Sequence, residues 1–195
     1  MIVIGVDLGK HGGLCALDSQ AQLLSIGEYL PRILELIPMP EDNRDIIEFL
    51  KTYSTVTHKG KVAYESCMLV MEEINVYTNN IININSTSKL LKQHGFFEGV
   101  GMSHGIEIHA VHPREWQKKM GCQTLQGKDK ITACKGMTLD QAKQHEKDYG
   151  TKGLALREAK KRFPGVRLIP DGCRVPHDGI VDSLLLAEYG RVYLI

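Results

Sequence analysis

The chain has 195 residues, of which 43% are hydrophobic and 24% are charged, and its formal net charge is +1. This length favours one domain, residues 1–195, with a core of its own. The sequence has no apolar run of 18 residues and no basic-then-apolar leader, so we expect neither a membrane span nor a signal peptide. The five cysteines show no paired spacing, which is typical of free thiols. We therefore expect a cytoplasmic protein, in the host cytoplasm if a phage encodes it.

The charges are unevenly distributed along the chain. Residues 1–113 carry 8 Lys and Arg against 13 Asp and Glu, a net charge of −5. Residues 114–174 carry 15 against 7, a net charge of +8, and residues 175–195 carry 1 against 3. An acidic part beside a basic part suits an enzyme that holds metal ions and binds a polyanion. A merely solvated helical surface explains the same charges equally well.

The first 18 residues predict a β-hairpin around a buried acid. Residues 2–8 are mostly aliphatic and predict a strand, a glycine-rich turn follows, and residues 14–17 predict a second strand. Asp7 lies within the first strand, where a carboxylate is costly unless a partner neutralises it. A bound cation is one candidate partner, and the backbone amides of the glycine turn are another. Asp-x-Gly between two apolar strands is similar both to metal-dependent nucleases and to sugar-kinase and actin-like ATPases.

The elements after the hairpin predict an α/β fold. Further strands are predicted over residues 22–30, 68–71, 106–111 and 167–169. Helices are predicted over residues 43–53, 86–103, 114–120, 151–163 and 178 to about 194. Residues 54–61 and 170–176 are predicted as loops, and residues 121–150 carry no pattern that places them. The order β-β-β-α-β-α-β-α predicts a mixed sheet with helices on both faces.

Three more acids lie at the ends of predicted elements. Glu72 follows the predicted strand at residues 68–71, and strand alternation allows only one of Glu72 and Glu73 into a common site. Asp178 and Asp182 are four residues apart, so they share one face of the last helix, in its first turns. Helix capping would explain Asp178 but not Asp182.

The four acids together suit a site for two divalent cations. Hard cations such as Mg²⁺ and Mn²⁺ prefer oxygen ligands, and Mg²⁺ is usually held by few carboxylates plus waters and phosphate oxygens. Two such ions about 4 Å apart can activate a water and stabilise the leaving oxygen in phosphodiester hydrolysis. The predicted ligands and catalytic residues are Asp7, Glu72, Asp178 and Asp182.

Four short motifs make the chain recognisable. In order they read GVDLGKHGGLCALD, LVMEEIN, VHPREWQKKMG and HDGIVDSLLLAEYG. Together they resemble the RuvC family of Holliday-junction resolvases, closest to its phage-type and mitochondrial-resolvase-like branches. The resemblance implies a ribonuclease H-like fold, a homodimer, Mg²⁺ or Mn²⁺, and symmetric nicking of four-way DNA junctions.

The resemblance also implies roles for single residues. Asp7 would bridge both metals, Glu72 matches the acid of the next core strand, and Asp182 matches the last acid. Asp178 matches the acid one turn earlier, although bacterial members space that pair by three residues rather than four. His177 could serve in place of Asp178, since some relatives use histidine nearby.

The DNA-contacting residues follow less directly from the resemblance. Lys118, Lys119 and Lys152 fall close to the DNA-facing lysines of the family, although lysines on a surface usually contribute little. Bacterial resolvases carry an aromatic residue shortly after the strand glutamate, where this chain has Asn75, with Tyr77 nearby. Tyr77 is therefore a candidate for DNA contact, and a sequence preference for cleavage does not carry over.

Several other functions compete with junction resolution. A flap or general branched-DNA endonuclease would use the same acids, and a non-catalytic junction-binding protein would be expected to lose them. The chain is too short for an actin-like ATPase and has no GxxxxGK[ST] loop, so we expect no nucleotide cofactor. A zinc site would have to be built from residues without recognised ligand spacing, namely Cys122, Cys134, His145 and Cys173.

The predicted dimer surface is the helix over residues 86–103. This helix carries Phe96 and Phe97 together, more apolar surface than one side of a helix can bury in its own sheet. Its glycines would permit close packing against a second copy. The alternative is that both rings enter the core of one protomer.

Overall fold

The computed structural model describes residues 1–23, 29–58, 61–64, 66–74, 84–123, 136–138, 140–141, 144–145 and 150–195. The strands are β1 (Ile2–Asp7), β2 (Gly13–Leu23), β3 (Tyr29–Pro38), β4 (Thr55–His58), β5 (Lys61–Tyr64), β6 (Cys67–Glu72) and β7 (Glu107–Val111). The helices are α1 (Asn43–Ser54), α2 (Ile84–Ser103), α3 (Pro113–Lys119), α6 (Thr151–Arg162) and α7 (Asp178–Tyr193). No described helix is long and apolar enough to cross a membrane.

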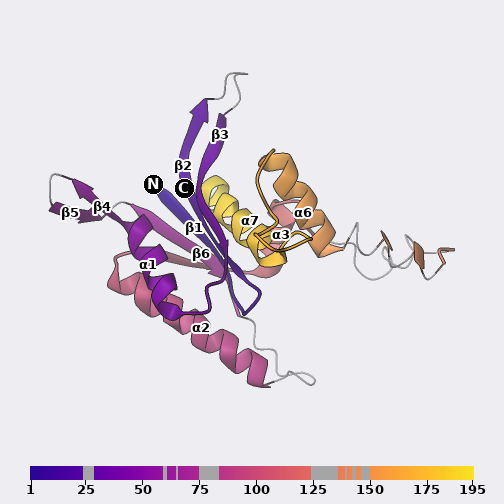
Figure 1. Ribbon diagram of the computed structural model, residues 1–195, viewed down its shortest axis with the longest axis horizontal. Helices are drawn as coiled ribbons and strands as arrows, with labels where there is room; N and C mark the ends of the chain where they lie inside the picture. Colours follow the sequence, from indigo (N-terminus) through magenta and orange to yellow (C-terminus); the bar gives the residue numbers. More distant parts are fainter. Residues whose placement is uncertain are drawn as a thin grey trace.

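The central sheet is mixed. Its five strands lie in the order β3-β2-β1-β6-β7 (Figure 1). β1 pairs antiparallel with β2, and β2 antiparallel with β3, whereas β1–β6 and β6–β7 are parallel pairs. Helices cover both faces, as predicted. The helices α1 and α2 lie on one face, and α7, α6 and α3 lie on the other.

Alternation along the strands divides the core into two clusters. On β1, Val3 packs toward α7, whereas Ile4 and Val6 pack toward α1 and α2. On β6, Val70 packs toward α7 and Leu69 toward the other face. Odd-numbered residues of β1 and even-numbered residues of β6 therefore share the α7 face.

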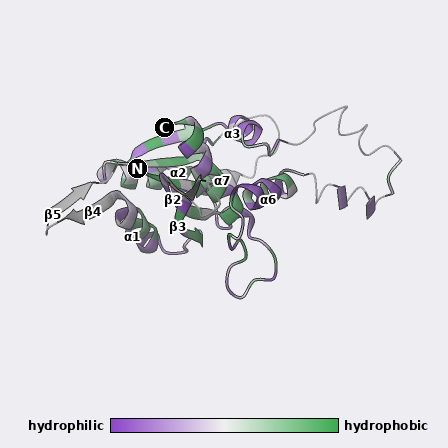
Figure 2. Ribbon diagram, turned by 90° about the horizontal axis from the view of Figure 1, so that it is seen from above, coloured by the Kyte–Doolittle hydropathy of each residue, from purple (hydrophilic) through white to green (hydrophobic). Residues whose placement is uncertain are grey.

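Helix α7 is buried around most of its circumference, which is typical of a helix that is apolar on all sides. Figure 2 shows hydrophobic residues concentrated on the central strands and α7, with hydrophilic residues on α1, α3 and α6. The helix approaches the backbone of β1 at Gly5, where a Cβ atom would lie 2.0 Å from the carbonyl oxygen of Ser183. Gly5 is thus required for the closest helix–sheet contact in the α7 face.

The hairpin of β2 and β3 differs from the predicted third strand. The prediction over residues 22–30 is wrong, because β2 runs on to Leu23 and β3 begins at Tyr29. The outer part of β2 is polar, so it lacks the apolar pattern that identifies a strand with a buried face. Pro31, expected to end the strand, lies inside β3, where an edge strand tolerates a missing N–H.

Two short segments also differ from their predictions. The predicted loop at residues 54–61 forms part of the small β4–β5 hairpin. The predicted strand at residues 167–169 is absent. Leu168 is buried there, and its carbonyl accepts a hydrogen bond from His177 N at 3.0 Å rather than from a strand partner. The predicted helices at residues 43–53, 86–103, 114–120, 151–163 and 178–194 are confirmed to within about two residues at each end.

Candidate active site

Asp7 and Glu72 end two neighbouring parallel strands. Val6 on β1 is level with Met71 on β6, so the next residue on each strand is an acid at the same edge of the sheet. Because side chains alternate along a strand, Asp7 and Glu72 are on the same face of the sheet as the residues that pack against α7. Glu73 is exposed, and its backbone N–H donates to the carbonyl of Val111 at 2.9 Å. The structure therefore places Glu72, not Glu73, on the α7 face.

The first turns of α7 bring two more acids to this edge. A Cβ atom at Gly179 would lie 2.3 Å from the carbonyl oxygen of His11, so α7 begins directly against the turn between β1 and β2. Asp178 and Asp182 are consequently held beside the end of β1. The helix is capped by His177, whose Nδ1 accepts from the backbone N–H of Ile180 at 3.3 Å. Capping by Asp178, which the sequence left open, is thus not what the structure has.

The electrostatics indicate that the four acids form one cluster. The pKa of Asp7 is raised to about 8, mainly by burial and then by the carboxylates of Asp182, Glu72 and Asp178, in that order. The pKa of Asp182 is likewise raised to about 7, mainly by burial and then by the carboxylates of Glu72 and Asp178. No hydrogen bond from any described residue reaches the carboxylate of Asp7 or Asp182. The amides of the glycine turn therefore do not neutralise Asp7.

A lysine provides positive charge at this cluster. Lys152, near the start of α6, forms an ion pair with Asp178 and lowers the pKa of Asp7 and Asp182. Both members of this pair are more than half exposed, so the pair itself adds little stability. Lys152 thus lies beside the acid cluster and partly offsets its negative charge.

The donor set fits a hard divalent cation. The cluster offers carboxylate oxygens only, and its two most buried carboxylates have no partner among the described residues. Among the described residues, no three His, Cys, Asp or Glu side chains form a preassembled metal site. Asp7, Glu72, Asp178 and Asp182 are the residues that could hold such an ion.

Trp116 is a site residue that the sequence reasoning missed. Its side chain is 1% exposed, and its indole Nε1–H donates to Oε1 of Glu72 at 2.8 Å. Burial raises the pKa of Glu72, while this hydrogen bond and His112 lower it. The tryptophan lies inside the VHPREWQKKMG motif, which carried the resemblance but assigned it no role.

The other predicted lysines lie in different surroundings. Lys118 is exposed on α3. Lys119 pairs with Glu115 at 3.1 Å, and its ammonium lies 5.0 Å from the ring centre of Tyr193. Tyr77 and Asn75 lie outside the described residues, as does Cys134 of the possible zinc site.

The two phenylalanines of α2 are not equivalent. Phe97 is fully buried among the residues of the α1/α2 face, so of the two rings it is not the one that a dimer surface on this helix could use. Phe96 is partly buried and packs on the edge of the same cluster. Phe97 lies on the side of α2 that meets the sheet, and the paired sequence positions could not show which side that was.

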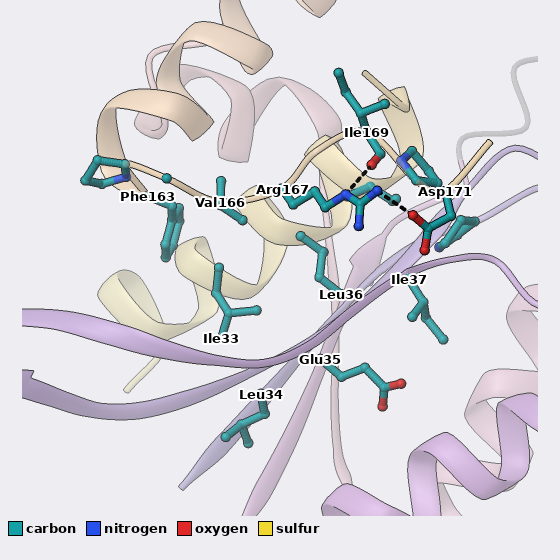
Figure 3. A pocket seen from close by; sticks show the side chains of 15 residues that line it. Ile33, Leu34, Glu35, Leu36, Ile37, Phe163, Val166, Arg167, Ile169 and Asp171 are labelled. Atoms are coloured by element: carbon teal, nitrogen blue, oxygen red, sulfur yellow. Dashed lines mark hydrogen bonds and ion pairs between the residues drawn. The ribbon is translucent and has the colours of Figure 1, made fainter. Parts of the chain in front are cut away.

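A cavity of about 640 Å³ lies between β3 and the segment after α6. Figure 3 shows Ile33 and Leu36 pointing toward the segment that carries Phe163 and Val166. None of the four acids lines this cavity, so it is separate from the candidate active site.

Comparison with known proteins identifies the fold. No family model and no curated protein matches the sequence. Thermus thermophilus RuvC in complex with a Holliday junction substrate aligns with a TM-score of 0.53 and 14% identity, over 100% of this chain and 95% of that one. The chain has the RuvC fold. A second Thermus thermophilus RuvC structure gives a TM-score of 0.52 and 15% identity over the same shares of the two chains.

The RuvC-like, ribonuclease H-like mixed sheet predicted from the four motifs is thereby confirmed at the level of the fold. The yeast mitochondrial Holliday junction resolvase aligns with a TM-score of 0.43 and 12% identity, over 97% of this chain and 77% of that one.

Proposed function

We propose that this protein is a divalent-metal-dependent endonuclease that resolves four-way DNA junctions by paired symmetric nicks. The observation that carries the proposal is the cluster of Asp7, Glu72, Asp178 and Asp182 at one edge of a RuvC-type sheet. The solved RuvC that shares this fold is bound to a Holliday junction substrate, which makes branched DNA the substrate class to test first.

Each residue of the site has a separate role in this proposal. Asp7 and Asp182 are partly buried and repel each other, so each is stabilised by any cation that binds between them. Two Mg²⁺ or Mn²⁺ ions, when bound, supply an activated water and a stabilised leaving oxygen. Trp116 fixes the orientation of Glu72, and Lys152 supplies positive charge beside Asp178. Glu73 takes no part.

A homodimer would provide the two nicks. One acid cluster cuts one strand, and a two-fold dimer presents two equivalent clusters to opposite strands. The proposed dimer surface is the outer side of α2, where Leu91 is 46% exposed and Met102 is 72% exposed. A Cβ atom at Gly95 or Gly99 would meet nothing within 4 Å, so a second helix could approach closely there. Light scattering should give twice the chain mass, and Met102→Asp should reduce it.

The decisive experiment compares DNA substrates. Purified protein is incubated with a synthetic four-way junction, a flap and a linear duplex, each with Mg²⁺ or with EDTA. We expect paired nicks at symmetric positions of the junction, in Mg²⁺ only. Equal cutting of flap and junction would favour a general branched-DNA endonuclease. Tight junction binding without cutting would favour a non-catalytic binding protein, and cutting in EDTA would contradict the metal mechanism.

We also propose a cytoplasmic location, on the basis of the cysteines. Among the described residues, Cys15, Cys122 and Cys173 are free thiols. Free thiols support a reducing compartment such as the cytoplasm.

A further inference from the structure

A second cleft lies beside the candidate active site, on the α1/α2 side of the sheet. It has a volume of about 640 Å³ and is enclosed by the turn after β1, the segment leading into α1, and the first half of α2. Its apolar lining includes Ile46, which is 1% exposed, and Phe96. The cleft is therefore a fixed feature of the packed domain rather than a gap between loose segments.

The charge of this cleft is opposite to that of the sequence around it. Residues 1–113 carry only 8 Lys and Arg and have a net charge of −5, yet three of those eight, Lys10, Lys89 and Lys92, line this one cleft. Glu41 is its only acidic lining residue, so the lining has a net charge of +2. None of the three lysines forms an ion pair with another described residue. Their charges are thus available to a ligand.

The lysines of the cleft differ from those of the basic segment, residues 114–174, in whether they already form ion pairs. Two of the three lysines predicted to contact DNA are already paired, Lys119 with Glu115 and Lys152 with Asp178. A paired lysine must give up its carboxylate before it can bind a phosphate, whereas the lysines of the cleft have no such partner to lose.

The cleft also lies next to the strand that carries Asp7, and a hydrogen bond connects the two. The backbone N–H of Gly9 donates to Oε1 of Gln93 on α2 at 2.8 Å, and Gly9 follows Asp7 by two residues. Lys10 is three residues from Asp7, so their Cα atoms are at most about 11 Å apart. A chain of phosphates that passes the acids would therefore reach the cleft within a few nucleotides.

We propose that this cleft binds the phosphate backbone of the DNA strand next to the phosphate that is cut, with Lys10, Lys89 and Lys92 as the contacting residues. Lys89 and Lys92 are one turn apart on one side of α2, an axial rise of about 4.5 Å. The inference rests on the proposed function and names the strand contact that this function would need.

The test measures the salt dependence of junction binding. Fluorescence anisotropy of a labelled four-way junction is followed in Ca²⁺ between 50 and 200 mM salt, for the wild type and for the double variant Lys89→Gln/Lys92→Gln. We expect the slope of log affinity against log salt to become shallower by about two, one for each lost phosphate contact, and by about one for Lys10→Gln. Lys51→Gln, on α1 outside the cleft, removes the same charge and should leave the slope unchanged.

A second measurement locates the contact on the DNA. Neutral methylphosphonates are placed one at a time within about four nucleotides of the nick. At one or more positions the neutral group should weaken binding of the wild type but not of Lys89→Gln/Lys92→Gln, which shows that the lysine and that phosphate interact. An unchanged slope in the double variant, or equal weakening of both proteins at every position, would overturn the inference.

The outcome separates this inference from the proposed function. Wild-type cleavage of the junction in Mg²⁺, together with unchanged slopes, would refute the cleft and leave the nuclease intact. Reduced slopes without cleavage would establish the DNA contact and refute the nuclease. A wild type that does not bind the junction would refute both.

Discussion

The two faces of the central sheet are built from alternate residues of the same strands, but helices cover them differently. We call the α7 face closed, because α7 touches the sheet backbone there although a cavity lies at its β3 edge, and we call the α1/α2 face open, because α2 exposes its outer side. On the α7 face, Gly5 and Gly179 allow α7 to touch the backbone of β1 and its turn, and the acids are held at the end of that contact. On the α1/α2 face, the outer side of α2 exposes Leu91 and Met102, and a basic cleft opens at its first half. We infer that the closed face holds the four acids in position. The exposed part of the open face is where the proposed contacts with DNA and with a second copy would form.

The largest expected effect comes from breaking the closed face. Gly5→Ala would place a Cβ atom 2.0 Å from the carbonyl oxygen of Ser183 and 2.5 Å from the backbone N of Ala187. Because both neighbours are backbone atoms of a buried helix, we expect the unfolding free energy to fall by about 4 kcal/mol. Urea denaturation followed by circular dichroism measures this. Gly95→Ala on the open face meets nothing and should instead stabilise the protein by up to about 1 kcal/mol. Equal effects would contradict the comparison.

The next effect is a pH dependence of stability in the metal-free protein. The folded-state pKa of Asp7 is about 8 and that of Asp182 is about 7, both above the ordinary value of 3.8. The folded protein therefore keeps protons that the unfolded chain releases, and its unfolding free energy should fall as pH rises from about 4 to about 8. Asn mimics the protonated acid, so in EDTA at pH 8 Asp7→Asn should be more stable than the wild type by about 3 kcal/mol.

The same pair of proteins supplies the controls for this prediction. At pH 4 the gain from Asp7→Asn should shrink to about 0.5 kcal/mol, because the folded carboxyl is then protonated and the unfolded one is protonated in roughly two chains of five. Saturating Mg²⁺ at pH 8 should also close the gap by stabilising only the wild type. Glu73→Gln changes an exposed neighbouring acid and should show no gain at either pH. A gain from Asp7→Asn that is the same at pH 4 and pH 8 would show that its pKa is not raised.

A smaller effect should follow from the hydrogen bond of Trp116. Trp116→Phe keeps an aromatic ring but loses the N–H that orients Glu72, so we expect metal affinity to fall by about tenfold. Calorimetric titration with Mn²⁺ measures this without DNA. Tyr189→Phe is a matched control, since it removes a buried aromatic donor that bonds Glu115, at 3.1 Å, outside the acid cluster. Equal losses in both variants would mean that Trp116 acts through packing alone.

The smallest effects distinguish the lysines of the basic segment. Lys118→Ala should make the salt slope of junction binding shallower by about one if Lys118 contacts a phosphate. Lys119→Ala should change it by less, because Lys119 is already paired with Glu115. A larger change for Lys119 than for Lys118 would show that the pair opens when DNA binds.

The sequence predicted those parts of the site that depend on periodicity. Alternation along the strands placed Asp7 within a buried strand and allowed only one of Glu72 and Glu73 into the site, and the spacing of four placed Asp178 and Asp182 on one side of a helix. All four positions recur in the structure at one edge of the sheet. Their role as metal ligands remains a prediction.

The sequence could not predict features that depend on distant contacts. The hydrogen bond from Trp116 to Glu72 joins residues 44 apart, and the contact of Gly179 with the turn near His11 joins the two ends of the chain. The β2–β3 hairpin was misplaced because the sequence of its outer part has no apolar alternation, and two adjacent rings in the sequence did not show that Phe97 is the one that meets the sheet. The cleft lined by Lys10, Lys89 and Lys92 was missed because these lysines come from separate elements that only the fold brings together.

The most direct test of the central claim is the stoichiometry of Mn²⁺ binding in the absence of DNA. Isothermal titration calorimetry at pH 8 compares the wild type with Asp7→Asn and with Glu73→Gln. If the four acids form one metal site, the wild type and Glu73→Gln should bind about two Mn²⁺ per chain, and Asp7→Asn should lose most of that binding. Equal Mn²⁺ binding by the wild type and Asp7→Asn would contradict the account.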